Sequence, residues 1–191
     1  NNPEWKTIVY DEKSKSFVVP NGSIGFRWGE EGKWNLLPKN AASQQEISAE
    51  LSCIDSKDTV VSVGFPHFEP GEGDLLYRNV PARKLKLANG EEILVTSVFD
   101  MQVAQYGIDR SLGGANVAKD YKDAAVAYTP AWAEKVTGVK AADLERTGRE
   151  FAYNASKTHG KSMVIMGAAI NHWYHNDMMY RGVMNLLHMC G

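Results

Sequence analysis

Short apolar runs divided by turn residues characterise roughly the first hundred positions of the 191-residue chain. Residues 6–10, 17–19 and 24–28 are rich in β-branched and aromatic side chains, which favour strands. Asn89-Gly90 lies between the apolar runs 84–87 and 92–99 and supplies the positive φ angles of a tight hairpin turn. We therefore predict strands and hairpins here, and no helix longer than about three turns before residue 100.

Two polar stretches interrupt this pattern. Residues 39–58 predict an exposed insertion with one strand around residues 47–54. Residues 101–127 are broken by glycines and predict a surface crossing. We take residues 1–126 as one β-rich segment and residues 127–191 as a second segment of α/β type.

The second segment has helical signals. Thr129 is a typical N-cap, Pro130 suits the first helical position, and the short helix should end at Gly138. A second helix is predicted over residues 141–153, where apolar and charged positions lie on opposite sides. The apolar run 163–167 predicts a strand buried in a parallel sheet. A loop over residues 168–176 and a helix from about Asp177 complete a mixed α/β (α+β) fold.

The densest set of functional groups follows the predicted strand. Asn171, His172, Trp173, Tyr174 and His175 stand together, followed by Asn176 and Asp177. Ligands of open α/β sheets bind at such strand-to-helix loops. Amide and imidazole groups can hydrogen-bond a pterin, a guanine, another purine or a dinucleotide, and aromatic planes can stack on it. Alternatively, the aromatic residues are packing anchors, and Asn176 or Asp177 is only a helix cap.

Composition excludes several functions. A net charge of −2 and a pI of about 6.2 indicate no surface for nucleic acid. Cys53 and Cys190 are too far apart in sequence for a cluster motif, so free thiols are expected. His172 and His175 lack a third metal ligand, and His188 is expected to be a partly buried structural residue. Nucleophile-elbow and phosphate-loop motifs are absent, and no apolar run is long enough to span a bilayer.

Four motifs together resemble one enzyme family. These are residues 20–29, 32–36, 127–134 and 170–175. They resemble the catalytic (alpha) subunits of membrane-bound respiratory nitrate reductases, within the molybdopterin oxidoreductase (dimethyl-sulfoxide reductase) superfamily. The chain opens without a methionine and closes on an apolar helical stretch, so we expect an internal piece of such a subunit.

The resemblance implies a fold and an activity. The β-rich half should precede part of a three-layer α/β molybdopterin-oxidoreductase domain. The parent would reduce nitrate to nitrite with electrons from quinol, using molybdenum bis(molybdopterin guanine dinucleotide) and one [4Fe–4S] cluster. Its partners would be an iron–sulfur beta subunit and a membrane haem gamma subunit. The subunit would lie peripherally at the cytoplasmic face of the cell membrane, and this piece alone should be inactive.

The resemblance also assigns residues. Asn171 and His172 match the loop that meets the cofactor, with His172 lining the pocket as a hydrogen-bond donor. Trp173, Tyr174 and His175 belong to the same motif and are expected to contact the cofactor or to pack beside it. No metal ligand is expected in the chain. Two alternatives remain: a piece of a formate dehydrogenase or dimethyl-sulfoxide reductase type enzyme, and a non-catalytic α/β binding module.

Overall fold

The computed structural model describes residues 7–20, 38–67, 75–158 and 160–190. The strand predicted over residues 24–28 lies outside the described residues. Two compact units make up the chain, unit 1 comprising residues 1–66 and 73–115 and unit 2 comprising residues 67–72 and 116–191. The domain division predicted between residues 126 and 127 remains a prediction.

Unit 1 begins with an antiparallel hairpin of β1 (Val9–Asp11) and β2 (Ser16–Val18), as the apolar runs predict. Its turn is organised by the buried carboxylate of Asp11. This carboxylate accepts hydrogen bonds from the Ser14 hydroxyl at 2.6 Å and from the backbone N–H groups of Lys13, Ser14 and Ser48. The Ser14 and Ser48 bonds stabilise the charged form and lower the pKa of Asp11 to about 2.

A three-stranded antiparallel sheet forms the larger part of unit 1, in the order β3 (Thr59–Phe65), β4 (Leu76–Lys86) and β5 (Glu92–Val95). The hairpin predicted at Asn89-Gly90 is confirmed, because Lys86 pairs with Glu92 across the turn and Gly90 has a φ of 88°. At such a φ an L side chain would be strained, so glycine suits this position.

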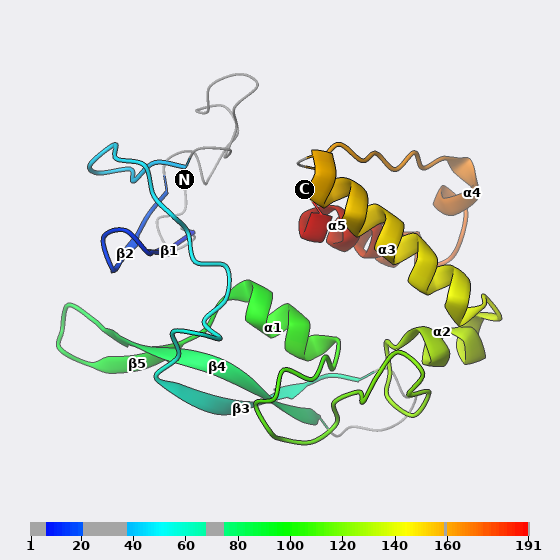
Figure 1. Cartoon of the computed structure of the whole chain (residues 1–191), viewed down its shortest axis with the longest axis horizontal. Coiled ribbons are helices and arrows are strands. Elements are labelled where there is room, and N and C mark those ends of the chain that lie inside the picture. The colour runs from blue at the N-terminus through cyan, green and yellow to red at the C-terminus, as the bar shows by residue number, and fades with distance from the viewer. Residues whose placement is uncertain (1–6, 21–37, 68–74, 159, 191) are drawn as a thin grey trace. The chain divides into compact units, whose positions relative to one another are not determined.

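Helix α1 (Val98–Gln105) corrects two predictions, a strand running to Phe99 and a surface crossing starting at residue 101. The strand ends early because the Ser97 hydroxyl accepts the backbone N–H of Asp100 at 3.0 Å and so caps a helix. The helix lies against the sheet (Figure 1) and buries Ala104 with Phe65 and Val80 in the core. In the described part of unit 1, α1 is the one helix that begins before residue 100.

The strand predicted around residues 47–54 is not formed. The insertion over residues 39–58 instead makes single bridges, Lys39 with Glu46 and Ala49 with Asp11, and it buries Ile47. Backbone bonds from Glu12 N–H to the Ser48 carbonyl and from Glu50 N–H to the Tyr10 carbonyl, both 2.9 Å, tie it to the first hairpin. These isolated hydrogen bonds take the place of the regular hydrogen-bond ladder of a strand. The segment is therefore bonded to the hairpin without forming a strand itself.

Unit 2 is helical. Helix α2 (Pro130–Thr137) confirms the prediction: the Thr129 hydroxyl accepts the Trp132 N–H at 3.0 Å, and Gly138 ends the helix with a φ of 75°. Helix α3 (Ala141–Thr158) extends beyond the predicted end at residue 153. A short α4 (Ala168–Asn171) and a long α5 (Asn176–Cys190) follow, and α3 packs against α2 and α5 (Figure 1).

The strand predicted over residues 163–167 is wrong. The backbone there has no regular structure, and Met163 and Ile165 are 79% and 84% exposed. A strand needs a hydrogen-bonding neighbour, and the described residues of unit 2 contain no strand to supply one. The sheets of the described chain are antiparallel, so the mixed α/β class is confirmed but the parallel arrangement is not. Among the described residues no helix is long and apolar enough to cross a membrane.

Candidate functional site

The predicted ligand loop is a short helix followed by a tight turn. Helix α4 ends at Asn171, and the backbone N–H of His172 donates back to the Ala168 carbonyl at 3.3 Å. The chain then turns through Trp173 and reaches His175, whose φ of 58° lies in the left-handed region that non-glycine residues rarely occupy. Helix α5 starts at the next residue. The motif Asn171–His175 therefore lies between the end of α4 and the start of α5.

Asn171 braces this turn against α5. The Asn176 side-chain amide donates to the Asn171 carbonyl at 2.7 Å, and the Tyr180 hydroxyl donates to the Asn171 side-chain oxygen. Both partners belong to α5, so they hold the end of α4 beside the start of the next helix. The side-chain oxygen of Asn171 is thus engaged within the chain, and this residue has a positioning role in the described structure.

The other four residues of the motif are exposed. Trp173 and Tyr174 are 68% and 86% exposed, and both histidines also face outward. The Tyr174 and His175 rings lie against each other, with centroids 4.0 Å apart and planes tilted by 57°. Neither Trp173 nor Tyr174 packs into a hydrophobic core among the described residues. The structure therefore brings imidazole groups and aromatic planes together on one exposed turn.

Two expectations for polar residues of α5 need correction. Asp177 is not the N-cap, since α5 begins at Asn176 and places Asp177 in the first turn of the helix. There its negative charge still interacts favourably with the helix dipole. His188 is exposed on α5 rather than partly buried.

This set of groups suits an organic ring better than a metal ion. Within the described residues, no group of three or more His, Cys, Asp or Glu side chains is placed to hold a metal. Amide, imidazole and aromatic groups instead match the hydrogen-bonding edge and the stacking face of a heteroaromatic cofactor such as a pterin. The donors and ring faces of residues 172–175 are of a kind that suits the pterin part of a molybdenum cofactor, and their contact with it stays a prediction.

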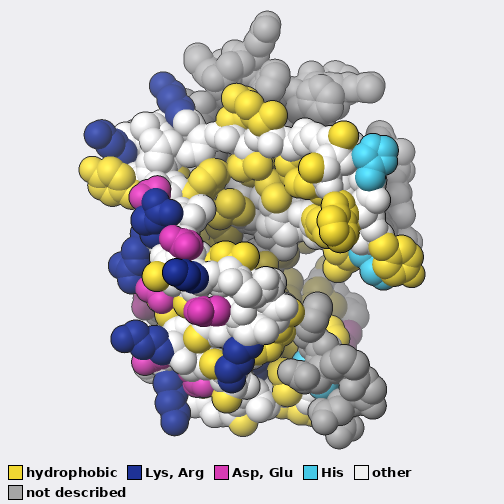
Figure 2. Space-filling view, turned by 90° about the vertical axis from the view of Figure 1, so that its right-hand side faces the viewer, with side chains coloured by type: hydrophobic (Ala, Val, Ile, Leu, Met, Phe, Trp, Pro, Cys, Tyr) yellow, Lys and Arg dark blue, Asp and Glu magenta, His cyan; other side chains and the backbone are white. Residues whose placement is uncertain are grey.

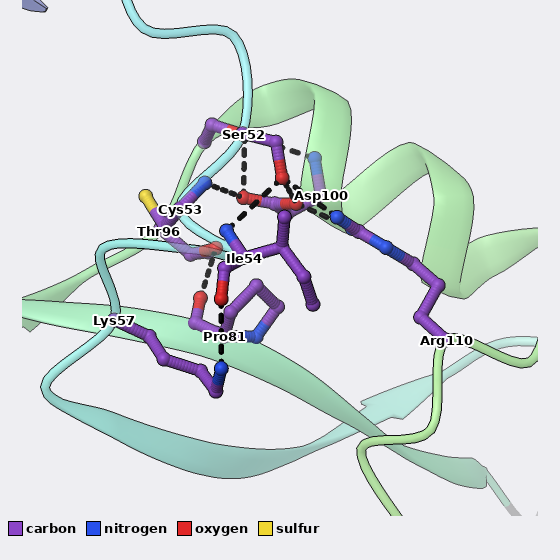
Figure 3. A network of polar contacts seen from close by, with 9 residues as sticks. Ser52, Cys53, Ile54, Lys57, Pro81, Thr96, Asp100 and Arg110 are labelled. Carbon is purple, nitrogen blue, oxygen red and sulfur yellow. Dashed lines mark hydrogen bonds and ion pairs between the residues drawn. The ribbon is translucent and has the colours of Figure 1, made fainter.

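Sequence reasoning missed a buried polar cluster around Asp100 in unit 1 (Figure 3). The fully buried carboxylate accepts the Ser52 hydroxyl at 2.6 Å, the Cys53 N–H at 2.7 Å and the Ser97 hydroxyl at 2.8 Å. The Arg110 guanidinium completes the set at 2.5 Å. Burial alone raises the pKa of Asp100, but the Ser52 and Arg110 hydrogen bonds outweigh it and leave the pKa below its usual value.

The cluster is structural rather than ligand-binding, because Asp100 is saturated by donors from its own chain. It joins the loop at residues 52–53, the start of α1 and the loop at Arg110. One feature of the sequence indicates part of this cluster. Ser97 and Asp100 are three residues apart, which is the spacing of a helix capping box. Cys53, next to the cluster, is a free thiol whose pKa burial raises, and Cys190 is also free in the structure.

A second polar arrangement fixes β4. Arg83 pairs with Glu50 at 2.9 Å and lies over the Tyr10 ring, 3.6 Å from its centroid. Arg78, almost fully buried, donates to the carbonyls of Ala104 and Gln105 at 3.1 and 2.8 Å and so neutralises the C-terminal end of α1. These contacts hold β4 against α1 and the first hairpin.

Comparison with known proteins gives a consistent result. No family model matches the chain. The chain is 48% identical over its whole length to the respiratory nitrate reductase 1 alpha chain of Escherichia coli, of which it spans 16%. It is 40% identical over 98% of its length to the nitrate reductase alpha chain of Bacillus subtilis, spanning 15% of it. A weaker relative is the perchlorate reductase subunit alpha of Dechloromonas aromatica, at 29% identity over 97% of the chain.

The chain thus spans about one sixth of the length of the relatives it matches, 15–16% in these three. The match includes the exposed turn of unit 2 and the buried cluster of unit 1, because it runs from end to end in the first of them. This chain belongs to the nitrate reductase alpha chain family, as a segment of such a subunit.

Proposed function

We propose that this chain is a segment of the catalytic subunit of a quinone-linked, molybdenum-dependent nitrate reductase and that it contributes part of the cofactor pocket. The observation that carries the proposal is the 48% identity to a respiratory nitrate reductase alpha chain over the whole segment. The parent is then an oxidoreductase of nitrate respiration that reduces nitrate to nitrite and water. The segment supplies no metal ligand and is inactive alone.

Within that enzyme the turn from Asn171 to His175 is the part of this chain that meets the cofactor. The bound cofactor, molybdenum bis(molybdopterin guanine dinucleotide), supplies the redox chemistry at its metal. Asn171 holds the turn in place through its bonds to Asn176 and Tyr180. The exposed His172 can donate a hydrogen bond toward an anion or an oxo group in the pocket. Trp173 and Tyr174 offer stacking faces.

The remaining parts of the machinery lie outside the described residues. We place one [4Fe–4S] cluster, the ligands of molybdenum and the guanine dinucleotide contacts elsewhere in the parent subunit. Electrons reach it from quinol through a membrane haem gamma subunit and an iron–sulfur beta subunit. These partners would hold the subunit peripherally at the cytoplasmic face of the cell membrane.

Two substitutions in the full-length enzyme test the role of the turn. His172→Ala should lower nitrate turnover by about 10²-fold, because a preorganised donor beside the reacting group is lost. Asp177→Ala is the matched control: it removes a charge five residues away, in the first turn of α5, and costs at most about 1 kcal/mol of stability. Turnover is measured as nitrate-dependent oxidation of a reduced dye, at equal molybdenum and pterin content.

A wild-type rate for His172→Ala would remove this residue from the pocket and leave only the bracing role of Asn171. The substrate itself is tested with the unmodified enzyme. Nitrate should support faster oxidation of the reduced dye than perchlorate or dimethyl sulfoxide, and formate, which donates electrons, should not reduce the oxidised dye. Faster turnover with one of the others would assign the parent to a different branch of the superfamily, and no turnover with any would favour a non-catalytic module.

A further inference from the structure

Helix α5 is apolar over more of its circumference than its neighbours in the structure cover. Val183, Leu186 and Leu187 are half-buried, and α3 packs against this helix. At about 100° per residue, Met178, Gly182 and Met189 fall within about 40° of one another on an adjoining side. We name these three residues the open face of α5. Asn185 borders this face, about 20° from Met178, and the polar residues Asp177, Arg181 and His188 occupy the sector beyond Asn185.

The open face has no cover among the described residues. Met178 and Met189 are 61% and 41% exposed, and a Cβ built on Gly182 would meet no atom within 4 Å. Hydrophobic side chains also gather on the side of the molecule shown in Figure 2. A helix at the surface of a globular protein normally shows one apolar stripe, whereas a helix that is apolar on several sides is buried.

Unit 2 also lacks a core of its own. The seven buried hydrophobic residues of the described chain are Val18, Ile47, Phe65, Val80, Ala82, Val103 and Ala104. All seven belong to unit 1. Burial of apolar area is the main favourable contribution to folding. Helices α2 to α5 therefore need further apolar contacts to form a stable unit.

We infer that, in the full-length subunit, the open face of α5 is covered by another segment of the same polypeptide. The relatives are about six times longer than this chain, which spans 16% of the first of them, so such segments exist in the family. Gly182 between two methionines suits close approach of a neighbouring backbone, and the flexible methionine side chains adapt to an irregular surface. The inference rests on family membership and not on the proposed reaction.

Methionine oxidation provides the test. Hydrogen peroxide converts an accessible thioether to a sulfoxide and is itself reduced to water. The full-length alpha subunit, purified without partner subunits, is treated with peroxide, and Met178 and Met189 are followed by mass spectrometry of their peptides. Both should oxidise about an order of magnitude more slowly in the native subunit than after denaturation. The 191-residue chain is treated in parallel.

Each other outcome overturns the inference. Equal oxidation rates in native and denatured subunit would mean an uncovered face. Protection that appears only when the partner subunits are present would assign the face to a subunit interface. Slow oxidation of Met178 and Met189 already in the 191-residue chain would mean that unit 1 covers the open face. If that slow oxidation depended on protein concentration, a second copy of the chain would cover it.

A pair of neighbouring substitutions provides a second readout in the full-length subunit. Gly182→Gln adds a side chain on the open face, and Arg181→Gln is the control on the polar sector. Glutamine favours a helix more than glycine does, so on an uncovered face Gly182→Gln should raise the melting temperature. On a covered face it should lower the melting temperature or the yield of folded subunit, while Arg181→Gln leaves both nearly unchanged. A rise for Gly182→Gln would contradict the inference.

Discussion

At the scale of single residues, the buried carboxylate of Asp100 is the most demanding feature of unit 1. A charge without solvent is costly unless donors surround it. Here three hydrogen-bonding groups and Arg110 do so, and the Asp100 side chain is 0% exposed. The arrangement holds three distant stretches of sequence together.

Arg110→Ala should therefore lower the free energy of unfolding by about 3 kcal/mol, because it leaves Asp100 charged, buried and without its cation. Urea denaturation of the 191-residue chain, followed by circular dichroism of the sheet, measures the change. Lys13→Ala is the matched control in the same unit. The ion pair of Lys13 with Glu46, at 3.9 Å, is largely exposed, so the loss should be below about 0.5 kcal/mol. Similar losses for both variants would mean that the buried pair contributes little.

Asp11 predicts a dependence of stability on pH. Its pKa is about 2 in the folded chain, against the ordinary aspartate value of 3.8. The folded state therefore favours the charged form, and this contribution is present above pH 3.8 and is lost as the pH falls through about 2. Asp11→Asn should destabilise unit 1 at neutral pH, and the difference from wild type should shrink between these two values. Urea midpoints at a series of pH values measure it, and a constant difference would contradict the assignment.

At the scale of elements, helix ends depend on single side chains. The Thr129 hydroxyl caps α2 by accepting the Trp132 N–H and also donates to the Asp123 carbonyl at 2.8 Å. Thr129→Ala should lower the stability of α2 by about 1 kcal/mol. Hydrogen exchange of the α2 amides measures the effect locally.

Thr137→Ala at the other end of α2 is the control for this prediction. On an exposed surface, the Thr137 hydroxyl donates back to the Ala133 carbonyl at 2.7 Å and accepts the backbone N–H of Val139, beyond the end of the helix, at 3.1 Å. Because alanine is a better helix former than threonine, this variant should leave exchange unchanged or slow it slightly. Faster exchange in both variants would show that the helix responds to any loss of threonine rather than to the cap.

At the scale of the whole molecule, the described residues contain no group of three or more His, Cys, Asp or Glu side chains that could hold a metal ion. The purified 191-residue chain should therefore contain neither molybdenum nor iron in stoichiometric amount and should not reduce nitrate. Metal sites in proteins generally require three or four ligands in fixed geometry. Elemental analysis of the purified chain checks the expectation. About one metal per chain would redirect attention to His172, His175 and His188.

Local signals in the sequence determined the features that depend on a few neighbouring residues. Thr129-Pro130 and Gly138 bound α2, and Asn89-Gly90 formed the predicted hairpin, because caps and tight turns are satisfied within a few residues. The motif from Asn171 to His175 and the family were also identified from the residues alone. The role of these five residues at the cofactor stays a prediction.

Only the tertiary structure decided the features that depend on distant partners. The run over residues 92–99 contains both a strand and the start of α1, because Asp100, which Ser97 bonds at the helix start, is held by Ser52 and Arg110 from elsewhere in the chain. Residues 163–167 have the composition of a buried strand but remain irregular, since strand formation needs a neighbour that the described chain does not provide. Hydrogen-bond pairing and burial of charge are long-range properties, and one-dimensional periodicity carries no information about them.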